Sequence, residues 1–178
     1  MNKSKICIAG VDPGLAATGL GLIRGCGYEI EDYAFGCIKT SSTLDIASRL
    51  EIIHNRLSGF FASYKPDILV IEDVFSVETY PKSGILLGNV IGVILLASRQ
   101  NNIRVTKIAV REAKKSLSGN GAASKQQLEK SVRSFLKHTE KISPYHASDA
   151  LALAIAGLNR YLFSGHLKEY SDLRNLKI

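Results

Sequence analysis

Three acidic residues and one histidine stand where apolar segments end or begin. Asp12 follows the apolar segment Ile6–Val11 and precedes a Pro-Gly turn, and Glu72 ends a second apolar segment. His146 and Asp149 open a long apolar segment near the C-terminus, and on a helix their spacing of three places both on one face. If the two apolar segments form neighbouring strands, all four side chains meet at one end of the sheet. Carboxylates gathered in this way repel one another unless a cation lies between them.

Each of these residues alone has a simpler explanation. Asp12 could shape its turn, Glu72 could be a solvated strand end, and Asp149 could be favoured by the dipole of a helix start. His146 could be a surface residue. Taken together these explanations weaken, because carboxylates that end several apolar elements need a compensating charge. Oxygen donors with one imidazole suit Mg²⁺ or Mn²⁺ better than Zn²⁺, and two such ions about 4 Å apart commonly serve phosphodiester hydrolysis.

The positive charge of the chain is concentrated in one window. The formal net charge is +7, from 23 Lys and Arg residues against 16 Asp and Glu residues. Residues 99–141 alone carry a net charge of +8, and the remainder carries −1. Most charged runs form a solvated helix face. Here the surplus is confined to one window interrupted by the glycine-containing segment Ser118–Ser124, which favours contacts with phosphates.

Length and composition limit the class of protein. A chain of 178 residues, 46% apolar and 22% charged, has the size of one domain with a sizeable core. The three cysteines, Cys7, Cys26 and Cys37, form no C-x-x-C pair, so we expect neither a disulfide framework nor a zinc site. The expected compartment is the reducing cytoplasm. We expect no secretory signal. The most hydrophobic run, Gly84–Ala97, is shorter than the roughly 20 residues that span a bilayer, which predicts a buried or interface helix and no membrane function.

The hydrophobic periodicity predicts a mixed α/β sheet in a single domain. Three strands joined by short turns form an antiparallel meander, and the later alternation of helix and strand favours parallel strands with right-handed crossovers. Thr43 is the expected N-cap of the first helix, and the last helix is expected after Ser143-Pro144. The predicted strands are 6–11, 20–24, 28–39, 67–73 and 104–108, and the predicted helices cover 44–57, 83–99, the segments on both sides of 118–124, and a final helix beyond 144.

Four segments of the chain resemble the motifs of one family, the bacterial Holliday-junction resolvases of the RuvC type. They are Val11–Gly19, Val70–Phe75, His146–Ile155, and a basic, glycine-containing segment from Arg111 to Lys125. The similarity covers about residues 5–160, in order and at family-like spacing. The first motif alone is a weak signal, whereas the four together are highly specific.

This resemblance implies an RNase H-like fold, a mixed sheet of about five strands flanked by helices, in one domain over residues 1–163. The polar composition of residues 164–178 predicts a C-terminal tail. The resemblance also implies a homodimer, with the apolar helix 83–99 at its interface, that binds one four-way DNA junction. The implied reaction is Mg²⁺-dependent, paired incision during recombination and DNA repair, with two ions per active site and Mn²⁺ as a substitute. A bacterial cytoplasmic location and a branch-migration helicase complex as partner are implied in the same way.

The resemblance also assigns catalytic roles. Asp12, Glu72 and Asp149 would be the metal-binding acids. Many relatives have Asp where this chain has His146, which adds no negative charge. His146 would either bind the metal through a neutral ring nitrogen or orient the attacking water.

The DNA contacts implied by the resemblance come from two regions. Phe75 would contact unstacked bases near the crossover. Lys114 and Lys125 would lie near the scissile phosphate and the backbone, and Arg111 and Lys115 belong to the same basic, DNA-binding segment.

Three other functions fit parts of the pattern. An actin-like sugar kinase or ATPase has a similar phosphate loop, but it needs two domains around the nucleotide, and 178 residues are too few. An RNase H-like nuclease acting on a flap or an RNA–DNA hybrid would use the same chemistry. A junction-binding scaffold without catalysis would gain nothing from clustered carboxylates that face DNA phosphates.

Overall fold

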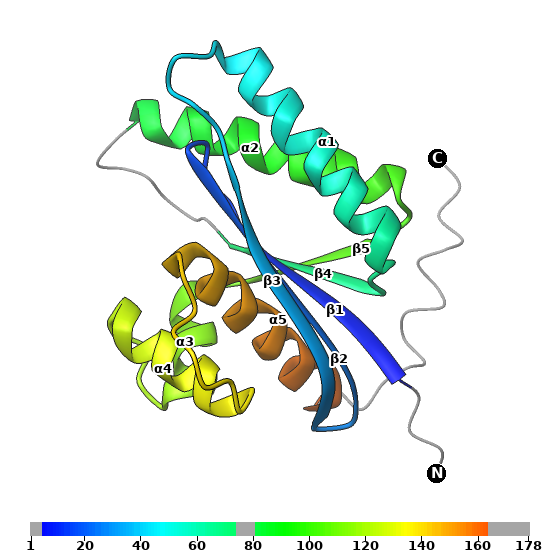
Figure 1. Cartoon of the computed structure of the whole chain (residues 1–178), viewed down its shortest axis with the longest axis vertical. Helices are drawn as coiled ribbons and strands as arrows, with labels where there is room; N and C mark the ends of the chain where they lie inside the picture. Colours follow the sequence, from blue (N-terminus) through cyan, green and yellow to red (C-terminus); the bar gives the residue numbers. More distant parts are fainter. Residues whose placement is uncertain (1–4, 74–80, 164–178) are drawn as a thin grey trace.

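A five-stranded mixed sheet forms the centre of the molecule (Figure 1). The computed structural model describes residues 5–73 and 81–163, so the predictions for Phe75 and for the tail 164–178 lie outside the described residues. Within the described ranges the strands are β1 (Lys5–Asp12), β2 (Ala17–Cys26), β3 (Glu29–Lys39), β4 (Ile68–Glu72) and β5 (Arg104–Ile108). The predicted α/β class and the number of strands are confirmed.

The strand order β3-β2-β1-β4-β5 places β1 in the middle of the sheet. β1, β2 and β3 pair antiparallel, as expected for strands joined by short turns, while β4 and β5 run parallel to β1. The register pairs Val11 of β1 with Ile71 of β4. The next residues, Asp12 and Glu72, therefore stand at the same end of two adjacent strands.

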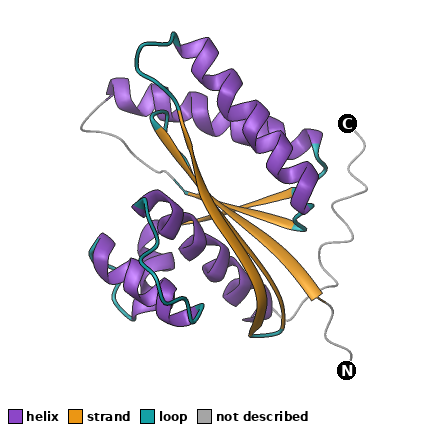
Figure 2. Ribbon diagram, viewed as in Figure 1, coloured by secondary structure: helices purple, strands orange, loops and turns teal. Residues whose placement is uncertain are grey.

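Helices cover both faces of the sheet (Figure 2). The pair α1 and α2 lies on one face, and α5 crosses the other, with α3 and α4 packed beyond it (Figure 1). In the described residues the helices are α1 (Ile46–Tyr64), α2 (Pro81–Gln100), α3 (Val110–Ser118), α4 (Lys125–Phe135) and α5 (Tyr145–Phe163).

The side chains of β1 alternate between two hydrophobic cores. Ile6 and Ile8 belong to the core shared with α5, whereas Ala9 and Val11 belong to the core shared with α1 and α2. Because successive strand residues point to opposite faces, the side chain of Asp12 belongs on the α5 face. In β4, Val70 belongs to the α5 core, and Glu72 lies two residues further on. The side chain of Glu72 therefore also belongs on the α5 face.

Glycines in β1 and β2 allow α5 to lie unusually close to the sheet. A β-carbon added at Gly10 would collide with the backbone of Ala150 in α5, and one at Gly19 would collide with the backbone of His146. The second of these contacts lies beside Asp12, because Gly19 and Asp12 are cross-strand partners. The missing side chains therefore set the distance between the strand-end carboxylate and the first turns of α5.

We expect Gly10→Ala to destabilise the protein by about 1–3 kcal/mol, because the added methyl group must push the α5 backbone away from the sheet. Urea unfolding monitored by circular dichroism measures the change. Gly36→Ala in β3 is the matched control, since a β-carbon there meets nothing within 4 Å. Equal stability of the two variants would contradict the close packing of α5.

The N-cap of the first helix differs from the prediction. Asp45, not Thr43, caps α1: its carboxylate accepts hydrogen bonds from the backbone N–H of Ser48 at 3.0 Å and from the Ser48 hydroxyl at 2.6 Å. The hydroxyl of Thr43 is hydrogen-bonded to that of Ser41 at 2.8 Å, within the preceding turn. Asp and Thr are both good capping residues, so the turn geometry decided which of them starts the helix.

The apolar helix α2 is partly a core helix. Val90, Ile94 and Ala97 are fully buried against the sheet, while Ile85 and Leu96 are 66% and 53% exposed. The helix is longer than the apolar run predicted from the sequence. Its segment Ser83–Gln100 has a mean hydropathy of 1.4 and passes the length and composition test for a membrane span, with 22% of it buried. One such helix is weak evidence for a membrane, and core helices pass the same test.

Candidate active site

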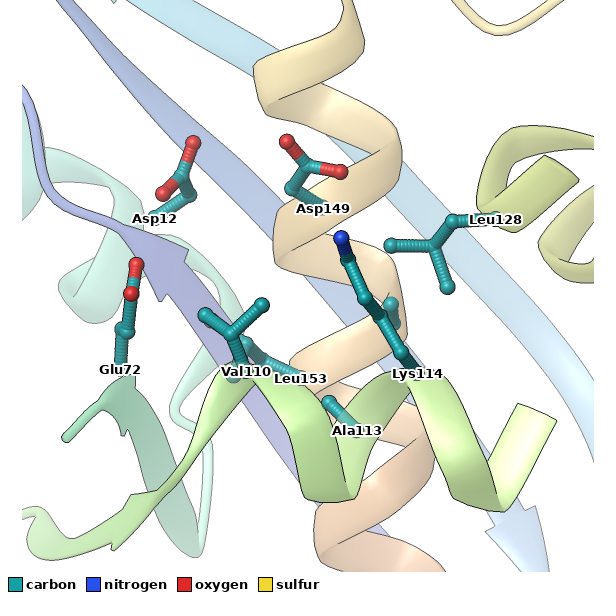
Figure 3. A pocket seen from close by; sticks show the side chains of 9 residues that line it. Asp12, Glu72, Val110, Ala113, Lys114, Leu128, Asp149 and Leu153 are labelled. Carbon is teal, nitrogen blue, oxygen red and sulfur yellow. The ribbon is translucent and has the colours of Figure 1, made fainter. Parts of the chain in front are cut away.

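The strand-end carboxylates and the start of α5 converge as the sequence predicted. β1 and β4 are neighbours, which was the condition for Asp12 and Glu72 to meet. Asp149 projects from α5 toward the same region, and Figure 3 shows the three carboxylates around one opening. His146 lies one turn before Asp149 and is hydrogen-bonded to Asp12, with 2.6 Å between its Nδ1 and Asp12 Oδ2.

These carboxylates line a pocket between the sheet and helices α3, α4 and α5. Lys114 of α3 also lines it, and Figure 3 shows its amino group directed toward Asp149. The remaining walls are apolar and consist of Val110, Ala113, Leu128, Ala152 and Leu153. Sequence reasoning did not identify these apolar residues, because their spacing is that of ordinary core-facing positions in helices.

Asp12 is well enclosed: 14% of its side chain is exposed, compared with 20% for Asp149 and 37% for His146. Burial raises the pKa of Asp12, and the hydrogen bond from His146 acts in the opposite direction. The short contact also fixes one oxygen of Asp12 and the orientation of the imidazole ring. The geometry thus pairs these two residues directly, which the sequence alone did not predict.

Glu72 and Asp149 are held in a repulsive environment. Burial is the main cause that raises the pKa of each, and the charge of Asp12 raises both further. Lys114 and Lys125 act against this rise. The Lys125 ammonium lies 3.9 Å from Asp149 Oδ2. The site therefore holds more negative charge than its two lysines balance.

Asp149→Asn should stabilise the protein against urea unfolding at pH 7.5 without divalent metal. In the folded protein the raised pKa means that ionised Asp149 carries a penalty, which unfolding relieves. The gain should shrink as the pH falls through the folded-state pKa, since the wild-type carboxyl is then protonated. Asp73→Asn, outside the pocket lining, is the control. A variant less stable than wild type at pH 7.5 would contradict the repulsion.

The chemistry of this donor set fits a hard divalent cation. Carboxylate oxygens with one imidazole are ligands for Mg²⁺ or Mn²⁺. A bound cation would compensate for the burial that raises the pKa of all three carboxyl groups, and for the repulsion that raises the pKa of Glu72 and Asp149 further. Among the described residues, no group of three or more His, Cys, Asp or Glu side chains is arranged closely enough to hold a metal ion as it stands. The fit therefore rests on the donor types and on their shared pocket.

The structure separates the predicted DNA-binding residues into two groups. Lys114 lines the acidic pocket and Lys125 lies beside Asp149. Lys125 is placed there by the start of α4, where Ser124 and Gln127 form a reciprocal capping box. Arg111 and Lys115 are exposed on α3 and do not line the pocket, although they belong to the same helix as Lys114.

Sequence comparisons place the chain among known nucleases. The family model described as crossover junction endodeoxyribonuclease RuvC matches residues 8–157. The chain is 36% identical over 151 residues to the RuvC protein of Prosthecochloris aestuarii, covering 85% of this chain and 80% of that protein. It is 39% identical over 148 residues to the RuvC protein of Serratia proteamaculans, covering 83% and 84%.

Solved structures agree with these sequence matches. The chain is similar to T. thermophilus RuvC in complex with a Holliday junction substrate, with a TM-score of 0.83 and 25% identity over 89% of this chain and 96% of that one. A Fowlpox virus resolvase bound to Holliday junction DNA has a TM-score of 0.54 at 14% identity, which shows a shared fold. The sheet and helices are thus RNase H-like, as in RuvC structures. By its sequence, its fold and the span of the match, this chain belongs to the RuvC family of crossover junction endodeoxyribonucleases.

Proposed function

We propose that this protein resolves four-way DNA junctions by paired, metal-dependent hydrolysis of phosphodiester bonds during recombination and repair. The observation that carries the proposal is the pocket in which three partly buried carboxylates meet a lysine, next to the most basic part of the chain. The relatives are named crossover junction endodeoxyribonucleases, and one structural neighbour was solved with its junction substrate. An acidic pocket with a basic border suits cleavage of a polyanion.

In this proposal Asp12, Glu72 and Asp149 hold Mg²⁺, with Mn²⁺ as a substitute and two ions per site. When bound, the metal supplies Lewis-acid polarisation of the phosphate and lowers the pKa of a bound water. His146 uses Nδ1 to hold Asp12, which leaves its Nε2 to bind the metal or to orient a water. Lys114 balances negative charge at the phosphate that enters the pocket, and Lys125 binds the adjoining backbone.

Family membership supports our proposals for the remaining DNA contacts and for the partners. We propose that Arg111 and Lys115, exposed on α3, contact phosphates outside the pocket, and that Phe75 contacts bases at the crossover. The proposed location is the bacterial cytoplasm, and the proposed partner is a branch-migration helicase complex.

We also propose a homodimer formed through α2. Its exposed apolar side chains include Ile85, Leu86, Leu95 and Leu96, although other residues of the same helix are buried in the core. Leu96→Arg should therefore shift the protein to monomer in sedimentation velocity runs, because a charge would be desolvated at the interface. Leu44→Arg, at a 40% exposed leucine outside α2, should leave the association unchanged.

The proposed function is tested with a synthetic mobile four-way junction, Mg²⁺, and wild-type protein beside Asp149→Asn. Symmetric, ligatable nicks from wild type, with binding but no cutting by the variant, are expected. Matched flap and RNA–DNA hybrid substrates separate this activity from that of a nuclease with another target. Junction binding without cutting by wild type, in Mg²⁺ and in Mn²⁺, would favour a scaffold instead.

A further inference from the structure

We propose that the ion pair between Glu112 and Arg160 is a positioning device that holds Lys114 over the acidic pocket. The inference rests on the proposed function, since its effect is on cleavage of the junction. It concerns two residues that do not line the pocket themselves.

One guanidinium joins three elements of the structure. Nη2 of Arg160, late in α5, donates to both carboxylate oxygens of Glu112 in α3, at 2.7 and 2.8 Å. Nη1 of the same side chain donates to the backbone carbonyl of Lys107 in β5 at 2.9 Å. Arg160 therefore ties α5 to the end of β5 and to the first turn of α3 at once. Arg is suited to this because its donors lie in one rigid plane.

Besides Arg160, helix α3 is held by Ala113 and Leu117, which pack in the core shared with α5. It is nine residues long, its N-cap Ala109 makes no side-chain capping bond, and Ala113 is its buried residue. A short helix of this kind depends on tertiary contacts for its placement. Glu112 and Lys114 lie on either side of Ala113, so a shift or rotation of α3 at Glu112 would move the Lys114 ammonium relative to Asp149.

The expected effect is on rate more than on stability. The side chains of Arg160 and Glu112 are 44% and 48% exposed, and ion pairs in such positions contribute little to the free energy of unfolding. Misplacing a charged group at a reacting phosphate by about 1 Å, by contrast, can cost a factor on the order of 10² in rate. An ion pair that contributes little to the free energy of unfolding can therefore have a large effect on the cleavage rate.

The test compares single-turnover cleavage of the four-way junction with its Kd, measured in metal-free buffer. Glu112→Gln should slow cleavage roughly tenfold, while the Kd and the urea midpoint remain close to wild type. The double variant Glu112→Arg with Arg160→Glu restores the ion pair but loses the bond to the Lys107 carbonyl, so relative to Glu112→Arg alone it should recover part of the rate. Glu31→Gln, which removes the charge from the 2.6 Å Lys5–Glu31 pair at the opposite end of β1 from Asp12, is the matched control and should cut like wild type.

A double-mutant cycle with Lys114→Met shows whether the pair acts through that lysine. If it does, Glu112→Gln adds little to the defect of Lys114→Met. If the rate losses of the two single variants multiply in the double variant, or if Glu112→Gln cuts at the wild-type rate, the inference is overturned while the proposed function stands. A wild-type protein that does not cut the junction would overturn the proposed function, and this inference with it.

Discussion

Glu72→Gln is expected to lower the single-turnover rate of junction cleavage on the order of 10³-fold. The carboxylate ends β4, lines the pocket with Asp12 and Asp149, and is one of three proposed metal ligands. A bound metal contributes several kcal/mol of transition-state stabilisation, and about 4 kcal/mol corresponds to this factor in rate. The amide keeps the size of the side chain and removes its charge, so the loss reports on chemistry and not on packing.

The neighbouring residue supplies the matched control for this prediction. Asp73 directly follows Glu72, and its backbone N–H donates to the carbonyl of Ile108 at 2.9 Å, but its side chain does not line the pocket. Asp73→Asn should therefore cut at close to the wild-type rate. Both variants should bind the junction at least as well as wild type, because each removes a negative charge near DNA. Equal losses of cleavage in the two variants would contradict the assignment of Glu72.

Lys114→Met is expected to reduce the cleavage rate about 10²-fold, with a small effect on junction affinity. Its ammonium points into the pocket toward Asp149, where it can balance charge that develops on the scissile phosphate. Removing one preorganised donor at such a position typically costs a factor on the order of 10²–10³. Methionine keeps most of the volume and the apolar contacts of the side chain.

Lys115→Met separates electrostatic binding from catalysis. Lys115 is exposed on the same helix and does not line the pocket. Its loss should weaken junction binding and reduce the slope of log affinity against log salt concentration by about one, while the rate for bound junction stays near wild type. Gel-shift titrations at several salt concentrations, with single-turnover rates, measure both. If Lys114→Met and Lys115→Met change affinity and rate equally, the assignment of Lys114 to catalysis and of Lys115 to binding is contradicted.

The sequence by itself determined the local features of this protein. The apolar segments, their Pro and Gly boundaries and their periodicity predicted the strands and helices, including the start of α5 after Ser143-Pro144. The positions of Asp12 and Glu72 at strand ends, and the spacing of His146 and Asp149, were also visible. These features depend on a few neighbouring residues, so one sequence is enough to identify them. The resemblance of four motifs then indicated the family that the comparisons confirmed.

Only the tertiary structure decided how these parts meet. The adjacency of β1 and β4 turned two strand ends into one pocket, and glycines at the α5 contact brought His146 onto Asp12. Packing of α3 and α4 on α5 selected Lys114 and not Lys115 for the pocket. Contacts across more than a hundred residues, such as that between His146 and Asp12, depend on how whole elements pack. Helical periodicity tells which residues share a face, but the position of a helix is set by all the surfaces that it buries together.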